Sequence, residues 1–535
     1  MALQIYQQQD FTGGLNFRAD QFQLADNESP DMKNVEIDPR GGLFSRGGME
    51  RINTTAVSGT WSPKMLHSFY GATPRVMLGT GAKIYQSTGG NFTALAYSVG
   101  NDIAVSNTAG PSFANWGTKL YMATGINGAS SYSWVTTDTY ATAIPVLTNS
   151  TWNNNYNSPG SNRFPRANYL AVHNNKMFAA GIHLNGTEYP NRLYWSHEDE
   201  PTDWAADDYI EINAGGSAIN ALAVVQGTLV IFKTNAIFVL FGYDSDDFRL
   251  VEIANNLGAS YHYSVAQTED GVYFYSAPEG LFFYDGVSIQ DKFSALRPAQ
   301  DLGYINSQYP DKIFVSWVRR RVWMSAPYSK TTTVTNATVN FVYDPSIGSN
   351  GAFTKFDTAD GYGLYRGCDF TDASNNNLHL MAHPIEARVL KVDLFANETD
   401  NITGSNVNFT SYYRTKWFDG GSYMQKKMFR RPDFVVKEPL VSQVISIKVY
   451  HDFKDGDGEE QKNFDLTLAP PPGGIIWGTD TWGDTWGSGV VSSDLVIGKN
   501  LGLARTVQME FTGPEGKSWG INSIGYKFQP RRVKG

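Results

Sequence analysis

The sequence has little cysteine, no long apolar run and no excess of positive charge. Among its 535 residues Cys368 is the single cysteine, so no disulfide can form within the chain. That fits assembly in a reducing compartment, and we expect Cys368 to be a small buried apolar residue. No stretch approaches the ~18 apolar residues of a membrane-spanning helix, and Met1–Gln7 lacks the basic start and apolar core of a signal peptide.

The charge balance is mildly acidic. The chain has 43 Lys and Arg against 52 Asp and Glu, a formal charge of −9. A domain that reads DNA sequence normally shows a basic stripe, and none is visible. An acidic surface would let DNA slide past without adhering, because phosphates are repelled. The composition therefore argues against sequence-specific DNA binding.

Helical periodicity is also scarce. Apolar positions rarely recur at the i, i+3, i+4 and i+7 spacing, whereas Gly- and Asn-rich turns interrupt the chain about every ten residues. Hydrophobic residues make up 41% and aromatic residues 14%, enough for sizeable cores. These features predict an all-β globular protein with helix below about a tenth of its residues.

A recurring pair of strands is the strongest positive signal. A short apolar strand begins at seven positions separated by 43 to 57 residues, namely Val76, Leu120, Met177, Leu229, Val272, Val322 and Leu378. Each is followed by a second strand, mostly rich in aromatic residues, at Ile84, Tyr132, Leu193, Ile237, Leu281, Phe341 and Val389. A period of about 40 to 50 residues in an all-β chain is typical of a β-propeller. We expect about seven blades between residues 61 and 395.

The segments before and after the repeats do not show the spacing of the blades. Residues 1–60 predict an extended N-terminal arm, with one helical turn at Glu28–Asn34 capped by Ser29. Residues 396–535 contain well-alternating strands at a different spacing and predict a separate C-terminal β-sandwich with a Trp/Gly-rich loop over 470–487. The loop's Trp477, Trp482 and Trp486 could pack on their own domain, on a neighbour, on a sugar or on a membrane surface.

Two acidic clusters offer candidate chemistry. His197-Glu198-Asp199-Glu200 with Asp203 reads as a solvated inter-blade loop, with a cation site or a carboxylate pair for glycoside hydrolysis as alternatives. The segment Asp455–Glu460 reads as a hairpin turn, with a weak cation site as its alternative, because its spacing does not match an EF-hand.

Other chemical signatures are weak. His379 and His383 are four residues apart on a predicted strand and turn, a poor arrangement for zinc. The basic runs Arg319–Arg321 and Arg531–Arg532 read as solvated turn and tail, with a partner or DNA contact as the alternative for Arg319–Arg321. No nucleophile elbow, P-loop or dinucleotide fingerprint is present. We therefore expect no catalytic, cofactor-binding or metal residues, no cofactor and no enzymatic activity.

The first 50 residues resemble a known family. Phe11–Asn16, Glu28–Asp31, Asn34-Val35, Gly41–Leu43 and Arg46–Gly48 look like the opening of tail nozzle, or packaged-DNA stabilisation, proteins of short-tailed bacteriophages. Asn191–Ser196 with Pro201–Trp204, and Lys426–Arg431, resemble later parts of such proteins. The shared features are strand and turn signals that extend over most of the chain.

The resemblance implies a structural virion protein below the portal and adaptor rings. It implies a hexameric ring whose lumen carries packaged double-stranded DNA, with the head-to-tail adaptor and tail fibres or spikes as further partners. Such a subunit would be assembled in the host cytoplasm, retain DNA in the tail and open for ejection. Two alternatives stay open, namely a carbohydrate-binding or carbohydrate-cleaving propeller and a hub or baseplate component of a long-tailed phage.

Overall fold

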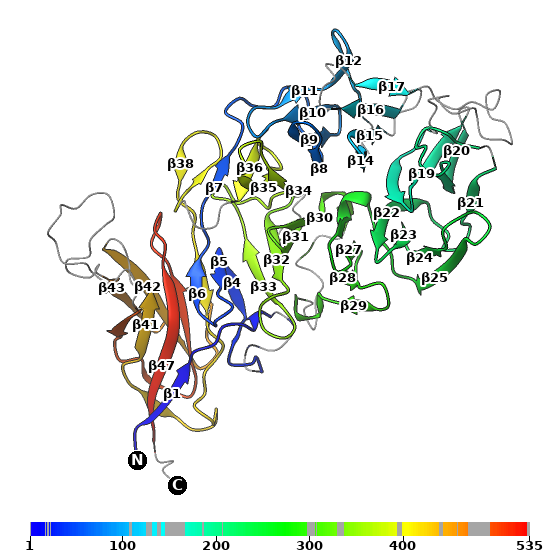
Figure 1. The fold of residues 1–535 in the computed structure, drawn as a ribbon. Helices are drawn as coiled ribbons and strands as arrows, with labels where there is room; N and C mark the ends of the chain where they lie inside the picture. Colours follow the sequence, from blue (N-terminus) through cyan, green and yellow to red (C-terminus); the bar gives the residue numbers. More distant parts are fainter. Residues whose placement is uncertain are drawn as a thin grey trace.

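The computed structural model contains a seven-bladed propeller, a β-sandwich and an N-terminal arm that belongs to both (Figure 1). It describes residues 2–531 except 17, 19–20, 22, 106–109, 125–130, 136–140, 145–165, 185–186, 206, 297–304, 306–307, 329–335, 393–397, 438–441, 457 and 469–492. Helix in this part of the chain is limited to three short 3₁₀ turns, η1 (His262–Ser264), η2 (Ser294–Leu296) and η3 (Pro310–Lys312). The all-β prediction is confirmed.

Six four-stranded antiparallel sheets form blades 1–6, and four antiparallel strands of a six-stranded sheet form blade 7. Their first strands are β8 (Pro63–Tyr70), β14 (Ser112–Trp116), β18 (Tyr169–His173), β22 (Ile219–Val225), β26 (Val265–Gln267), β30 (Phe314–Val318) and β34 (Gly367–Thr371). Each first strand contacts the first strand of the next blade, and β34 contacts β8, so the ring closes. The propeller expectation is therefore confirmed with seven blades.

The predicted strand pairs are the second and third strands of each blade. The second strands are β9 (Pro74–Thr80), β15 (Lys119–Ala123), β19 (Lys176–Leu184), β23 (Thr228–Lys233), β27 (Val272–Ser276), β31 (Arg321–Ala326) and β35 (Asn377–Ala382). The third strands are β10 (Ile84–Ser87), β16 (Ser131–Val135), β20 (Thr187–Trp195), β24 (Ala236–Phe241), β28 (Gly280–Tyr284), β32 (Val339–Asp344) and β36 (Val389–Val392). Most are buried on both faces, which explains their continuous apolar runs.

The fourth strands lie on the outside, and most are short or partly exposed, whereas that of blade 6 is buried against the arm. They are β11 (Thr93–Ala94), β17 (Thr142–Ile144), β21 (Tyr209–Glu211), β25 (Arg249–Asn255), β29 (Ile289–Asp291), β33 (Ala352–Phe356) and, for blade 7, β7 (Met49–Arg51). Strand β7 comes from the arm and pairs with β36, so the seventh blade combines residues more than 300 positions apart. Short strands β37 (Asp400–Asn401) and β38 (Asn406–Val407) extend this sheet, and β12 (Ala96–Ser98) pairs with β13 (Asn101–Asp102) after blade 1.

The sandwich consists of an eight-stranded and a five-stranded sheet. The first contains β1 (Gln4–Gln8), β5 (Val35–Ile37), β6 (Leu43–Ser45), β40 (Lys427–Phe429), β41 (Asp433–Lys437), β44 (Ser493–Ile497), β45 (Gly502–Ala504) and β47 (Gly520–Pro530). The second contains β4 (Asp31–Lys33), β39 (Tyr412–Arg414), β42 (Gln443–His451), β43 (Lys462–Leu468) and β46 (Val507–Thr512). Their inner faces meet in a core where the rings of Phe434 and Phe511 lie 5.5 Å apart.

The arm is part of both folded units. Its strands β1 and β6 pair with β47, and β4 pairs with β39, while β2 (Gly14–Leu15) pairs in parallel with β3 (Glu28–Ser29). The helical turn expected at Glu28–Asn34 is wrong, because these residues form β3 and β4 and use their backbone groups in sheets. One buried apolar cluster runs from Tyr273 and Phe341 in the propeller, through Met32 in the arm, to Phe511 in the sandwich.

Candidate functional site at the junction of arm, propeller and sandwich

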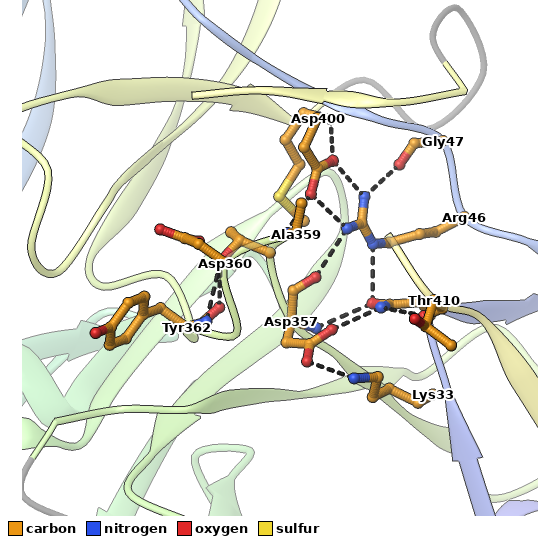
Figure 2. A network of polar contacts seen from close by, with 12 residues as sticks. Lys33, Arg46, Gly47, Asp357, Ala359, Asp360, Tyr362, Asp400 and Thr410 are labelled. Carbon is orange, nitrogen blue, oxygen red and sulfur yellow. Dashed lines mark hydrogen bonds and ion pairs between the residues drawn. The ribbon is translucent and has the colours of Figure 1, made fainter. Parts of the chain in front are cut away.

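Arg46 occupies the centre of a buried polar network between the arm and the two folded units (Figure 2). Its Nη1 donates to the carbonyl of Gly47 at 2.7 Å and to Asp400 Oδ1 at 2.9 Å. Its Nη2 donates to Asp400 Oδ2 and to the carbonyl of Asp357, both at 2.8 Å, and its Nε donates to Asn34 Oδ1 at 2.9 Å. All five N–H groups of the guanidinium are used, and the side chains of Arg46 and Asp400 are fully buried.

Asn34 connects this ion pair to two further segments. Its Nδ2 donates to Asp357 Oδ1 at 2.6 Å and to the carbonyl of Thr410 at 2.8 Å, and its backbone N–H donates to the carbonyl of Lys355 at 2.8 Å. Asp357 also forms an ion pair with Lys33 at 2.7 Å. The backbone φ of Asn34 is 54°, a left-handed conformation that Asn tolerates better than most residues. We call Lys33, Asn34, Arg46, Asp357 and Asp400 the clamp.

A second set of ion pairs holds the arm against blade 6. Lys355 contacts Asp31 at 2.7 Å, and Arg321 bridges Glu36 at 3.1 Å and Asp344 at 2.8 Å. Burial raises the pKa of Glu36, and the opposing attraction of Arg321 lowers it less than burial raises it. The junction is thus secured by several charged groups that are largely withdrawn from water.

Two glycines allow the arm to approach neighbouring backbone closely. A Cβ on Gly48 would lie 1.9 Å from the carbonyl oxygen of Thr399, and a Cβ on Gly14 would lie 2.7 Å from that of Phe353. Gly14 also has a φ of 67°. Sequence reasoning noted these Gly-rich stretches but missed the clamp. The available signal was an Asn and an Arg placed within otherwise Gly-rich or apolar stretches.

The acidic cluster of blade 3 is connected to a loop of the next blade. Glu198 accepts a hydrogen bond from the hydroxyl of Tyr243 in blade 4, while Asp203 is buried and its carbonyl accepts the N–H of His197. Next to them, Lys176 pairs with Asp244 at 2.8 Å. Glu198 therefore joins loops of two blades, as the inter-blade interpretation predicts, whereas Asp203 is buried and not solvated.

The other candidate residues are separated by the fold. Asp455 lies between the paired strands β42 and β43, as the hairpin reading predicts, and accepts from Gln21 at 3.0 Å. His379 contacts Asp369 at 2.8 Å, whereas His383 contacts Asp360 at 3.3 Å. In the described part of the chain no three His, Cys, Asp or Glu side chains are grouped so that they could hold a metal ion.

The basic runs have different positions. Arg319 and Arg320 form the turn between β30 and β31, with φ of 55° and 56°, and the N–H of Arg319 donates to both oxygens of Asp369 at 3.0 Å. Arg531 is exposed, and Arg532 lies outside the described residues, as does the loop with Trp477, Trp482 and Trp486. Cys368 is partly exposed, not fully buried as expected, and desolvation raises the pKa of its thiol to about 12, which disfavours the reactive thiolate.

Comparisons with known proteins give distant structural likenesses only. No family model and no curated protein matches the chain. An ancestral GH74 enzyme is 12% identical with a TM-score of 0.41, covering 63% of this chain and 48% of its own. The extracellular domain of a putative one-component system from B. thetaiotaomicron is 10% identical with a TM-score of 0.39, covering 77% and 48%. BBS1N, solved with ARL6DN, is 8% identical with a TM-score of 0.39, covering 66% and 98%.

The chain thus spans about half the length of the first two of these structures. Similarities this distant say nothing about activity or partners. Separately, the described residues include no helix with the length and apolar character needed to cross a bilayer.

Proposed function

We propose that the chain is a structural subunit of the tail nozzle of a short-tailed bacteriophage. It is assembled in the host cytoplasm, takes its place in the virion tail as a ring below the adaptor, retains packaged DNA and opens for ejection. Fibres or spikes attach around this ring, and DNA passes through the lumen without sequence-specific contacts. Its work is assembly and gating, with no chemical step.

The observation that carries this proposal is where the family-like residues lie. Asn34 and Arg46 are members of the clamp, and Gly14 and Gly48 make the close backbone approaches of the arm. The resemblance therefore covers the residues that join propeller to sandwich. A similar junction supports a similar arrangement of arm, propeller and sandwich, and in tail nozzle proteins this arrangement itself carries out the function.

The outer face of the eight-stranded sheet supports assembly into a ring. Leu495 and Ile497 on β44 are 62% and 60% exposed, and Ile5 on β1 is 60% exposed. In the sheet, Leu495 lies opposite Val435, which lies opposite Ser523, and Ile5 lies opposite Lys527. Ser523 and Lys527 lie on the same face of β47, so Leu495 and Ile5 share that face. The outer face of the other sheet is instead largely polar, with exposed Ser446, Lys448 and other charged or hydroxyl side chains. On that second face Val444 is the exposed apolar residue of β42, at 39%, and a concentration of apolar exposure on the first face is typical of a contact surface.

A second copy of this chain is the occupant that fits this face. Among the described residues, β44 pairs only with β41 and β1 pairs only with β47, so both edges of the sheet are open. Strand β1 runs antiparallel to β47 and β44 runs parallel to it. The β44 of one copy and the β1 of the next would therefore pair antiparallel. Such a head-to-tail contact joins two different surfaces and produces rings when it closes.

The function is tested on particles of the phage that encodes the chain. Antibodies against the chain should label the distal tail in electron micrographs, and a double substitution Leu495→Glu, Ile497→Glu should give particles that lack the nozzle and lose DNA. The matched control is Val287→Glu, because Val287 is 89% exposed in a blade 5 turn far from this face. Labelling of the head, or no labelling, would contradict the nozzle assignment. Normal nozzles on the double variant would contradict only the proposed contact face.

Carbohydrate binding is the second candidate, favoured by the exposed ring of Tyr243. This ring is 46% exposed and its hydroxyl donates to Glu198, a pairing of aromatic face and carboxylate suited to a sugar. Titration calorimetry with host polysaccharide would detect it. Binding that disappears in Tyr243→Ala would favour this candidate, and no heat from either protein would eliminate it.

A further inference from the structure

Arg366 lies beside the ring of first strands through which each blade contacts the next, here called the propeller axis. It immediately precedes β34, and its Nη1 donates to the carbonyl of Val265 in blade 5 at 2.7 Å and to that of Val315 in blade 6. A longer bond of 3.4 Å reaches the carbonyl of Tyr263. Arg366 therefore connects three blades through one nitrogen.

The opposite edge of the same guanidinium has no partner. Every hydrogen bond that Arg366 makes among the described residues uses Nη1, and its Nε is buried without an acceptor. No carboxylate in the described part of the chain forms an ion pair with it. The Nε and Nη2 edge is the one that binds a carboxylate or phosphate side-on through two parallel hydrogen bonds.

Two imidazoles lie close to this guanidinium. His67 in blade 1 shares a hydrogen bond of 3.0 Å with Asn115 Oδ1, and His262 in η1 contacts the carbonyl of Pro111 at 3.2 Å. Burial and then the positive charge of Arg366 lower the pKa of His262 to about 4, and the pKa of His67 is lowered by the same two causes. Arg366, His67 and His262 are here called the axial cluster.

The neighbouring charged groups do not neutralise Arg366. Asp369 accepts the backbone N–H of Arg319 and contacts His379, and Asp311 contacts Lys312 at 3.4 Å. Lys64 adds a buried cation, with its Nζ 5.0 Å from the centre of the Tyr263 ring. The Arg366 side chain is partly exposed, but its Nε–H is buried without an acceptor, and a buried donor of this kind is costly unless a ligand supplies the acceptor.

We propose that the axial cluster binds one small oxyanion, a phosphate, sulfate or carboxylate, with the Nε and Nη2 edge of Arg366 as its principal ligand. His67 and His262 flank the anion, and the anion supplies the negative charge that this region of the propeller lacks. The inference does not depend on the nozzle function, because it rests on contacts within the propeller alone.

The first test is a titration of the full-length protein with phosphate, sulfate and acetate against chloride at equal ionic strength. Calorimetry should show saturable binding at one site, and the melting temperature should rise by a few degrees and then level off. Arg366→Gln should abolish the saturable rise. The control Arg320→Gln should retain it, because Arg320 is an exposed turn residue. A rise that never saturates, or that is equal in Arg366→Gln and the wild type, would overturn the proposal.

The second test does not need a folded variant. Crystals of the wild-type protein soaked in selenate should show an anomalous peak beside Nε of Arg366. Crystals that diffract well and show no such peak would also overturn the proposal.

Discussion

The propeller and the sandwich are both antiparallel β-structure, but they are assembled from the chain in opposite ways. Six of the seven blades use four strands that follow one another directly in the sequence. In the sandwich, Gln4 pairs with Phe528 and Met32 with Tyr413, so its sheets need both ends of the chain. The comparison indicates that blades can form from local hairpins, whereas the sandwich forms only once the arm has returned to the C-terminal strands.

The blades and the junction also differ in the interactions that hold them together. Within the blades the second and third strands are held mainly by apolar burial, while the junction uses the clamp and the ion pairs of Lys355 and Arg321. A buried ion pair is a weak source of net stability but is costly to break. The clamp therefore acts mainly by allowing one arrangement of arm, propeller and sandwich and penalising others.

The largest expected effect comes from breaking the clamp. Asp400→Asn leaves the fully buried Arg46 without its counter-charge and should lower the free energy of unfolding by about 3–5 kcal/mol. Urea denaturation measures this. The control is Asp38→Asn, whose exposed partner Arg40 should limit the loss to below about 1 kcal/mol. Equal losses of unfolding free energy in the two variants would show that the buried clamp contributes no more to stability than the exposed ion pair.

A smaller effect is expected where the arm touches backbone. Gly48→Ala places a methyl group against the Thr399 carbonyl and should cost about 1–3 kcal/mol in the free energy of unfolding. Gly90→Ala is the matched change in blade 1, because a Cβ there has no neighbour within 4 Å, and it should be neutral within about 0.5 kcal/mol. Equal melting temperatures for the two variants would contradict the close approach of Gly48 to the Thr399 carbonyl.

Lowering the pH should destabilise the propeller through His262, a member of the axial cluster. The imidazole of His262 stays neutral in the folded protein down to its pKa of about 4, whereas an unfolded histidine takes up a proton below about 6.5. The unfolded state then binds more protons, so lowering the pH from 7 to 5 should cost roughly 1–2 kcal/mol of stability. The loss should shrink in His262→Gln and persist in His197→Gln, which changes an exposed residue. A wild-type stability that is unchanged between these pH values would contradict the lowered pKa of His262.

The smallest effect on folding is expected on the outer face of the sandwich. Leu495→Glu should change the free energy of unfolding by no more than about 0.5 kcal/mol, because the side chain is already in water. On the inner face, Leu466→Ala should cost about 2–5 kcal/mol, because Leu466 is 3% exposed. A large loss in Leu495→Glu would mean that this face is covered within the single chain, leaving nothing for a second copy.

The sequence predicts the propeller better than the sandwich, for physical reasons. Runs such as Val272–Ser276 and Gly280–Tyr284 are buried on both faces, and their spacing repeats, so periodicity reveals them. Outer strands such as Arg249–Asn255 face solvent and have no comparable pattern. The pairing of β7 with β36 and of β1 with β47 joins distant segments whose individual patterns carry no information about their partner.

The junction is the hardest part to predict. Arg46 and Asp400 are 354 positions apart, and each alone reads as a solvated charge. Asn34 looks like an ordinary turn residue until its left-handed backbone and its contacts with Asp357 are seen. The resemblance to tail nozzle proteins pointed to these arm residues, but it could not indicate which distant groups they contact.

The central claim is that arm, propeller and sandwich form one cooperative unit through the clamp, and calorimetry tests it most directly. The intact wild-type chain should unfold in a single transition whose calorimetric and van't Hoff enthalpies agree, and Asp400→Asn should split it into separate propeller and sandwich transitions. Two well-separated transitions in the wild-type protein would contradict the claim, because they would mean that the two units unfold independently with the clamp intact.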